Sequence, residues 1–433
     1  MMVTTDYKDA YQAVQKNTST QWLQMLHDEG MAHVERVGWP TMRHEEWKYT
    51  STKALQDQRF QLAVAAGTVD TAVLEAARVA DSIELVFVDG FFQPDLSRLN
   101  LVPQGVSIET LHASQTRGEN TLTPLLYRSL SDHDSMFTGL NGALLQGGLC
   151  VQIKAKTLCG PLIHVIHVTS ASAGEAMVFP RQVWHVESSA QAAVLQTVIS
   201  GGDAATLMSA VTDIHVESNG QLAYALVQAE NLAASQAHHT RVTLAPDSRL
   251  EAFCLTTGGR WVRNDLDVTL DGSNIDAKLN GLYLPRGEQH IDNHSVIDHR
   301  EPNSQSSQLY KGVLDDQSRA VFNGKIFVRD IAQQTNAYQL NRNLLLSPGA
   351  EVDTKPQLEI FADNVRCTHG ATIGPVNPDE IFYLQSRGFE RSQAIRTLAR
   401  GFARETLSHL TDQRLLKVLT RRLDRTFGDE EGV

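Results

Sequence analysis

The chain has 433 residues, of which 42 % are hydrophobic and 20 % charged. This composition is that of an ordinary globular protein and excludes a disordered, collagen-like or coiled-coil chain, while the length allows one large core or several smaller ones. The formal net charge is −12 with neutral histidines, which disfavours a general surface for nucleic acid or for an anionic membrane. We therefore expect neither nucleic acid nor a membrane among its partners.

The start of the chain and its cysteines both indicate a cytoplasmic protein. The first residues lack the basic start and the apolar run of a signal peptide, and no stretch approaches about 18 uncharged apolar residues, the length of a membrane span. The four cysteines are widely scattered and form no CxxC pair, so we expect free thiols rather than disulfides. They are Cys150, Cys159, Cys254 and Cys367.

Residues 1–82 are predicted to form an N-terminal helical region. Apolar residues recur there at helical spacing after a candidate N-cap at Ser19 or Thr20, and Gly38 ends the pattern. These residues are Trp22, Leu26, Val34 and Val37. The segment from Arg43 to Thr50 follows as a compact charged and aromatic stretch, which we interpret as part of a packed cap.

Residues 83–375 are predicted to form a β-helix core. From Ile83 onward the sequence consists of short alternating runs, each preceded by a polar corner. Gly220, Asp247 and Gly272 mark three such corners, separated by 27 and 25 residues. This spacing favours a solenoid in which each turn is buried against its neighbours over a sandwich, whose turns recur every 8 to 12 residues or so.

Residues 376–433 are predicted to form a C-terminal helical domain. A short helix opens at Asp379 and ends at Gly388. Two further helices, the second beginning near Ser392, make a hairpin. From Arg391 to Arg425 nine basic residues stand against three acidic ones, a local balance of +6 that opposes the charge of the whole chain.

Common catalytic motifs are missing from the sequence. There is no phosphate-binding loop, no glycine-rich dinucleotide turn, no nucleophile elbow of a hydrolase and no zinc-protease motif. We therefore expect a protein that is not an enzyme and does not handle nucleotides itself.

Three histidines in one predicted strand, His290, His294 and His299, suggest a metal site at first sight. Side chains alternate along a strand, so His290 and His294 share a face while His299 points the other way. Because metal ligation needs convergent ligands, we favour a structural or surface role for this trio.

Cys367 and His369 form a sharper candidate. On a strand they share a face, with α-carbons about 7 Å apart, which lets a thiolate and an imidazole meet one iron or zinc ion. Two ligands do not complete a tetrahedral site, so the remaining positions are left to Glu359, to Asp363 or to another subunit. The alternative is a buried thiol beside a hydrogen-bonded histidine.

Several long segments in order resemble the SufD family of iron–sulfur cluster assembly proteins. The resemblance is dense over residues 255–405 and sparser before, where Arg43 to Thr50 resembles the family's Glu-Glu-Trp-Lys-Tyr-Thr segment. The related SufB family shares the C-terminal half, but the short chain, the few cysteines and the tryptophan-rich start favour SufD. The matching segments include 261–266, 289–299, 310–314, 320–326, 333–347, 351–360, 363–370 and 382–388.

The resemblance implies a right-handed parallel β-helix that joins SufB and the ATPase SufC in a scaffold for building and transferring iron–sulfur clusters, and that aids iron acquisition. It implies that Cys367 and His369 lie at the SufB contact and help to form the nascent cluster. No cofactor would be tightly bound, only transient iron or a transient cluster at this interface. Alone, the chain would form a homodimer.

The resemblance also implies that the C-terminal helices receive SufC, which would explain why this chain lacks a phosphate loop. The residues that we assign to this partner contact are Phe382, Tyr383, Arg387, Arg396, Arg400 and Phe402. Two other functions compete with this interpretation: an autonomous β-helix enzyme that binds a metal or acts on polysaccharide, and a homodimer that only buffers metal.

Overall fold

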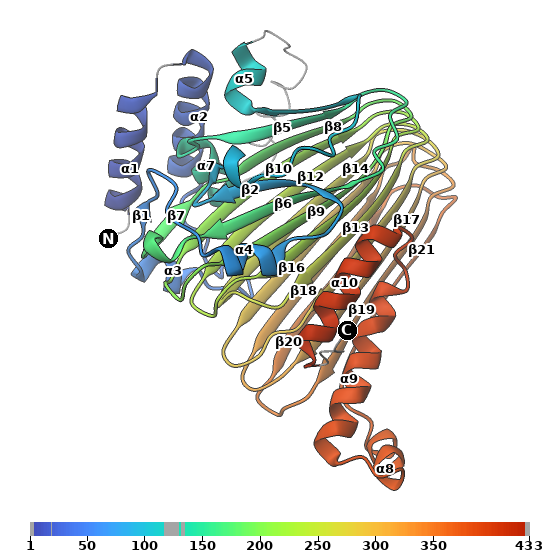
Figure 1. Cartoon of the computed structure of the whole chain (residues 1–433). Helices are drawn as coiled ribbons and strands as arrows, with labels where there is room; N and C mark the ends of the chain where they lie inside the picture. Colours follow the sequence, from blue (N-terminus) through green and yellow to red (C-terminus); the bar gives the residue numbers. More distant parts are fainter. Residues whose placement is uncertain (1–3, 19, 117–129, 131–134, 429–433) are drawn as a thin grey trace.

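The computed structural model describes residues 4–18, 20–116, 130 and 135–428. Its centre is a parallel β-solenoid with helices at both ends (Figure 1), which confirms the predicted mainly β fold with helical flanks. Within these residues the strands form two sheets, one of eleven strands and one of ten. From β8 onward, consecutive strands along the chain alternate between the two sheets, so each turn of the solenoid adds one strand to each.

The first sheet contains β4 (Val106–Thr110), β5 (Gly148–Ile153), β8 (Arg181–Val186), β10 (Leu207–Val216), β12 (Ser235–Leu244), β14 (Trp261–Leu270), β16 (His290–His299), β18 (Arg319–Val328) and β20 (Glu351–Ile360), with β7 (Ala176–Val178) paired to β10 and β1 (Gln61–Leu62) paired to β7. The second sheet contains β3 (Phe91–Phe92), β2 (Ser82–Val88), β6 (Leu162–Thr169), β9 (Gln191–Ser200), β11 (Gln221–Ala229), β13 (Arg249–Thr256), β15 (Asp276–Tyr283), β17 (Gln305–Leu314), β19 (Asn336–Leu345) and β21 (Arg366–Pro375).

Parallel pairing in register stacks equivalent residues of successive turns inside the solenoid. One interior column consists of Val186, Val216, Leu244 and Leu270, each directly opposite the next in the strand pairing and each buried. The alternating apolar residues of each strand face this interior, and their burial supplies the main favourable free energy of the core.

The polar corners place asparagine or aspartate in the left-handed region of the backbone. Asn219, Asp247 and Asn274 have φ angles of 58°, 62° and 61°, a conformation that these residue types tolerate better than other non-glycine residues. Their spacing of 28 and 27 residues confirms the predicted period. Two of the predicted markers shift, because Asn219 rather than Gly220 and Asn274 rather than Gly272 occupy the left-handed positions.

A buried helix interrupts the region that the sequence predicts to be nearly all β. After the short α5 (Leu111–Thr116), α7 spans Met136–Ala143, and all eight of its residues are buried. A helix that is buried on every side has no polar face, so its sequence carries no amphipathic period.

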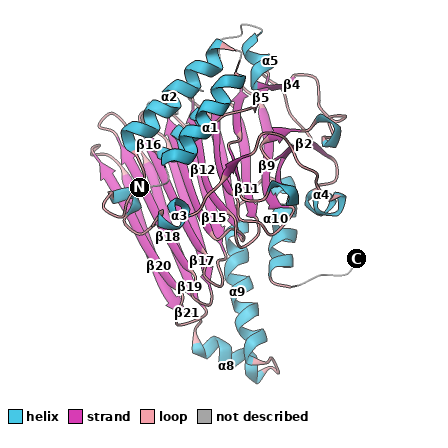
Figure 2. Ribbon diagram, turned by 90° about the vertical axis from the view of Figure 1, so that its left-hand side faces the viewer, coloured by secondary structure: helices cyan, strands magenta, loops and turns pink. Residues whose placement is uncertain are grey.

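The N-terminal helices cover the first sheet (Figure 2). α2 begins after the predicted N-cap Thr20 and ends at Gly38, as predicted, whereas Ser19 lies outside the described residues. α2 packs on α7, which in turn lies on β10. The helices and short 3-10 turns of this part of the chain are α1 (Thr4–Asn17), α2 (Gln21–Val37), η1 (Glu45–Trp47), α3 (Lys53–Asp57), α4 (Thr71–Ala77) and η2 (Pro94–Leu96), and η3 (Ala171–Ala173) follows β6.

The three C-terminal helices agree with the sequence prediction and are α8 (Pro378–Ser386), α9 (Arg391–Leu407) and α10 (Gln413–Thr426). α9 and α10 pack their apolar faces on the second sheet, where Ala403 and Leu419 share a buried cluster with Phe253. α8 extends beyond them (Figure 1). No helix among the described residues is long and apolar enough to cross a membrane.

The solenoid ends open on its C-terminal side. β20 and β21 are the last strands of the two sheets, and no strand in the described part of the chain pairs with their outer edges. Most of their side chains are half-buried or exposed. This end therefore carries the unpaired backbone groups that accept a further strand.

Candidate metal centre at the open end

Cys367 and His369 lie on β21 and face the solenoid interior. In the register with β19, Cys367 is opposite Ala337 and His369 is opposite Gln339, and both β19 residues are buried. Cys367 is half-buried at the margin of the core, whereas His369 is exposed because no further turn covers it. The geometry thus agrees with the predicted shared face. Both residues lie at the open C-terminal end of the solenoid.

The thiol of Cys367 has little tendency to ionise by itself. Burial raises its pKa above the ordinary value, against a smaller opposing effect of the backbone hydrogen bond with Ala337. As a metal ligand, Cys367 would lose its proton to the metal ion rather than by ionising on its own.

The acidic residues considered as further ligands do not complete the site. Glu359 lies on the outer face of β20, where its carboxylate is 3.7 Å from the Nζ of Lys325, whereas Leu358 beside it packs into the core. Asp363 is exposed in the corner between β20 and β21. Among the described residues no group of three histidine, cysteine or acidic side chains could hold a metal ion. By itself the pair offers two donor groups, one thiol and one imidazole.

The other cysteines are unsuited to metal chemistry. Cys150 and Cys159 are buried, and burial raises the pKa of Cys254 to about 11. The Cys254 sulfur contacts the hydroxyl of Thr256 and the amide of Asn264 inside the solenoid. Cys367 is the thiol that combines a histidine neighbour with a position at the open end.

The open end also exposes apolar side chains. Phe361 is 59 % exposed in the corner after β20, and Ile373 and Tyr338 are 48 % and 45 % exposed on β21 and β19. Apolar side chains gathered beside unpaired strand edges are typical of association surfaces.

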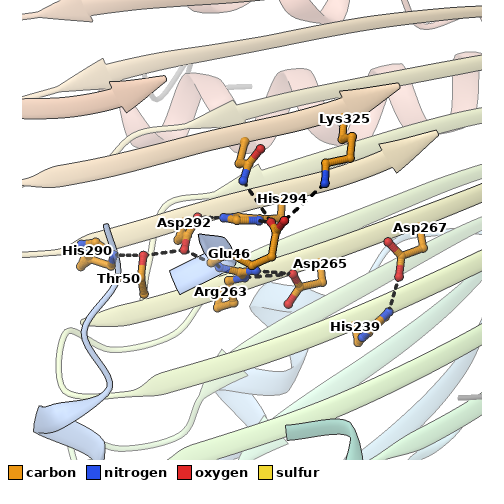
Figure 3. Close-up of polar contacts among 11 residues, drawn as sticks. Glu46, Thr50, His239, Arg263, Asp265, Asp267, His290, Asp292, His294 and Lys325 are labelled. Carbon is orange, nitrogen blue, oxygen red and sulfur yellow. Dashed lines mark hydrogen bonds and ion pairs between the residues drawn. The ribbon is translucent and has the colours of Figure 1, made fainter. Parts of the chain in front are cut away.

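The histidine trio divides as the strand parity predicts. His290 and His294 lie on the outer face of the first sheet, within a network of polar contacts (Figure 3). His299 faces the interior instead, opposite Leu270 and Val328, and its Nε2 is 2.9 Å from the hydroxyl of Ser306. These positions agree with the structural role favoured for the trio.

The residues assigned to partner contact fall into two groups. On α8, Phe382 and Tyr383 are 72 % and 57 % exposed, and the Arg387 guanidinium lies 5.3 Å from the Tyr383 ring centroid. Arg396 is exposed on α9. Arg400 and Phe402 instead contact other residues of this chain.

Arg400 and Phe402 help to hold α9 in place. Arg400 donates hydrogen bonds to the carboxylate of Asp424 on α10. The Nζ of the buried Lys311 lies 4.2 Å from the Phe402 ring centroid. These two residues stabilise the helical hairpin and its contact with the second sheet.

Sequence reasoning missed the partners of His294 and Asp292. Glu46 reaches His294, and Thr50 reaches Asp292, both from the N-terminal segment that the sequence indicates only as a packed cap. The signal was present in the sequence as two adjacent glutamates followed by an aromatic and a threonine, but nothing in it identified a partner about 240 positions away.

Family models match both halves of the chain. The model described as the SufBD core domain of SUF system FeS cluster assembly matches residues 167–402, and that of the SufBD protein N-terminal region matches residues 1–164. The chain belongs to the SufBD family. This SufBD protein therefore has a role in iron–sulfur cluster assembly by the SUF system.

Three relatives illustrate the similarity of this SufBD protein to known chains. The iron–sulfur cluster assembly protein SufD of Escherichia coli K12 is 31 % identical over 94 % of this chain and 96 % of its own length. A SufBD family protein of Synechocystis is 32 % identical over 86 % of this chain and 84 % of its own. The chloroplastic protein ABCI7 of Arabidopsis thaliana is 25 % identical, with coverages of 91 % and 84 %.

Proposed function

We propose that this SufBD protein is a non-catalytic SufD-type subunit of a cytoplasmic scaffold, in which it pairs with SufB and binds the ATPase SufC while iron–sulfur clusters are built and transferred. The observation that carries the proposal is the position of Cys367 and His369 side by side on the last strand of the second sheet. A thiol and an imidazole suit iron, and the remaining coordination positions would be filled from outside this chain.

Pairing with SufB would use the open end. A second solenoid could continue both sheets by adding strands to β20 and β21, with main-chain hydrogen bonds along both edges. The exposed apolar side chains around Phe361 would be buried in the same contact. In the absence of SufB, a second copy of this chain would use the same edges and form the expected homodimer.

Binding of SufC would use α8 and the exposed basic residues of α9. Phe382 and Tyr383 offer two adjacent aromatic rings to solvent, and Arg387 and Arg396 add positive charge nearby. Exposed aromatic residues and arginines are enriched at the energetic centres of protein interfaces.

The metal would be held only transiently. Two ligands from one chain hold iron weakly until a partner supplies the rest, and such a shared site can release its cluster to a recipient. We propose that the subunit aids iron acquisition in this way and keeps no tightly bound cofactor.

Purification with and without co-expressed SufB and SufC separates this function from its two competitors. The proposal expects iron and sulfide only in the co-expressed complex, and their loss in a Cys367→Ser variant but not in a Cys254→Ser control. A chain that holds iron alone at full occupancy would support the metal-buffering homodimer. Polysaccharide cleavage by the isolated chain, lost on substitution of its own residues, would support the autonomous enzyme.

A further inference from the structure

The segment Glu45–Thr50, here called the clasp, lies across the outer face of the first sheet. Its Trp47 ring stacks on Trp261 of β14 with ring centroids 6.4 Å apart and an interplanar angle of 5°. The Arg263 guanidinium lies 4.4 Å from the Trp47 ring centroid, and its Nη1 donates a 2.9 Å hydrogen bond to the carbonyl oxygen of Glu46. These contacts fix the clasp on β14 and orient the side chains on either side of it.

From this anchor the clasp reaches three further strands. The Thr50 hydroxyl donates a 2.5 Å hydrogen bond to Asp292 on β16 and accepts one from the Nε2 of His290 at 2.9 Å. The Glu46 carboxylate is 3.4 Å from the Lys325 Nζ on β18. Glu45 forms an ion pair with Lys355 on β20, the last strand of the sheet.

His294 lies between two carboxylates at the centre of these contacts (Figure 3). Its Nε2 is 3.0 Å from the Asp292 Oδ1, and its Nδ1 is 3.3 Å from the Glu46 Oε2. Both ring nitrogens face acceptors, so the arrangement suits the imidazolium form, in which both nitrogens donate. The charged or titratable groups around His294 are Glu46 on the clasp, Asp292 and His290 on β16, Arg263 and Asp265 on β14, and Lys325 on β18.

The same contacts lead to the open end. Lys325 lies between the Glu46 carboxylate at 3.4 Å and the Glu359 carboxylate of β20 at 3.7 Å. β20 continues through the corner of residues 361–365 into β21, which carries the Cys367 and His369 pair. The clasp therefore joins the N-terminal region to the strand next to the proposed metal and partner site.

We propose that the clasp holds the last turns of the solenoid in the arrangement that presents Cys367 and His369, and that protonated His294 closes it. Glu46, Thr50 and His294 are then positioning residues for the open end. The role of the clasp in binding SufB and iron rests on the proposed function. Its effect on the order of β20 does not depend on that function.

The charges give the clasp a defined pH range. Burial and the Arg263 guanidinium lower the pKa of His294, but the carboxylates of Asp292 and Glu46 outweigh them and raise it above the ordinary value. The hydrogen bond with His294 is the main reason that the pKa of Glu46 falls to about 2. The contribution of His294 is complete below its unfolded pKa of about 6.5 and is lost as the pH rises through its raised folded pKa. Glu46 contributes above its unfolded pKa of about 4.5 and loses this contribution only on the acid side. Deprotonation of His294 is therefore what weakens the clasp on the alkaline side.

Hydrogen exchange of the full-length protein, read by mass spectrometry on peptides from residues 351–375 and corrected for intrinsic rates, tests the clasp. We expect exchange to rise about tenfold between about pH 6 and about pH 8.5, equivalent to about 1.4 kcal/mol of opening free energy. Glu46→Gln should give the fast exchange already at the lower pH, and His294→Asn should remove the pH dependence. His239→Asn is the matched control, since His239 pairs with Asp267 at 2.7 Å on the same face and should leave residues 351–375 unchanged.

Two results would contradict the proposed role of the clasp. One is unchanged exchange of residues 351–375 in Glu46→Gln, and the other is a pH dependence that persists in His294→Asn. If the variants do not fold, NMR titration of the His294 imidazole in the unmodified protein provides the test. A His294 pKa at or below the ordinary value would contradict the proposal that protonated His294 holds the clasp. A Cys367→Ser and His369→Ala variant should keep the same exchange behaviour, so loss of cluster supply in that variant bears on the proposed function alone.

Discussion

Cys367 and His369 lie two residues apart on the last strand of the second sheet, and both continue a column of interior positions. The equivalent residues one turn earlier, Ala337 and Gln339, are fully covered by the turn that carries the pair. No described strand covers Cys367 and His369 in the same way. The two residues thus occupy interior positions of the solenoid, and they stay uncovered because β21 is the last described strand of its sheet.

Iron(II) binding by this pair is expected to strengthen with pH. Burial raises the pKa of Cys367, so the metal must displace the thiol proton at neutral pH, and each ion bound releases about one proton. Calorimetry of the full chain in two buffers with different ionisation enthalpies measures this release. Cys367→Ser should abolish it, and Cys254→Ser should not. Binding without proton release would contradict thiolate ligation.

Replacing both aromatic residues of α8 is expected to remove SufC from the purified complex. Phe382→Ser with Tyr383→Ser deletes two exposed rings without touching a buried contact, so the fold should persist while the anchor of the interface is lost. Co-purification with tagged SufC measures the effect. Val64→Ser, at an apolar residue that is 78 % exposed in the N-terminal region, is the control. Retained SufC in the double variant would reject α8 as the docking surface.

Lys311 is expected to stabilise the docking of α9 on the second sheet. Its Nζ donates a 2.9 Å hydrogen bond to the carbonyl oxygen of Phe402 and pairs with Glu405. Because Glu405 is half-exposed, Lys311→Ala should lower the free energy of unfolding by about 1 to 3 kcal/mol rather than the full cost of a broken buried pair. Denaturant unfolding measures this change. The exposed Lys417→Ala should stay within about 0.5 kcal/mol, and an equally small effect at Lys311 would show that the contact adds nothing.

The purified chain is expected to show no ATPase and no glycosidase activity. Its sequence contains no phosphate-binding loop. It also shows no signature of the paired carboxylates that a glycosidase needs. Phosphate release and reducing-sugar assays on the isolated chain test this. Turnover that survives removal of contaminating enzymes and disappears with a point substitution in this chain would contradict the assignment.

The sequence predicted most of the solenoid because its regularities are local. Alternating strands, polar corners and the C-terminal helix signals all depend on neighbours within one turn of the chain. The structure confirms the strands and the helices, and it shifts two of the three corner markers by one or two residues. The sequence does not predict helix α7, because every residue in it is buried and a helical period is recognised by its polar face. The candidate pair Cys367 and His369 also follows from local parity.

The clasp could not be predicted in the same way. The contact between Thr50 and Asp292 joins residues 242 positions apart, and only the stacking of the solenoid turns brings β14, β16, β18 and β20 under one short segment. The role of Glu359 was open for a similar reason. Its outward direction depends on the pairing of β20 with β18, which sets Lys325 beside it.

Complementation of a strain that lacks its own SufD tests the central claim most directly. The claim is that Cys367 and His369 serve cluster assembly rather than packing. Cys367→Ser and His369→Ala, alone and together, should cripple iron–sulfur cluster supply while SufB and SufC still co-purify with the variant at normal yield, because neither side chain is fully buried in this chain. Cys254→Ser is the control and should complement fully. Full complementation by the double variant, or loss of the complex itself, would contradict the account.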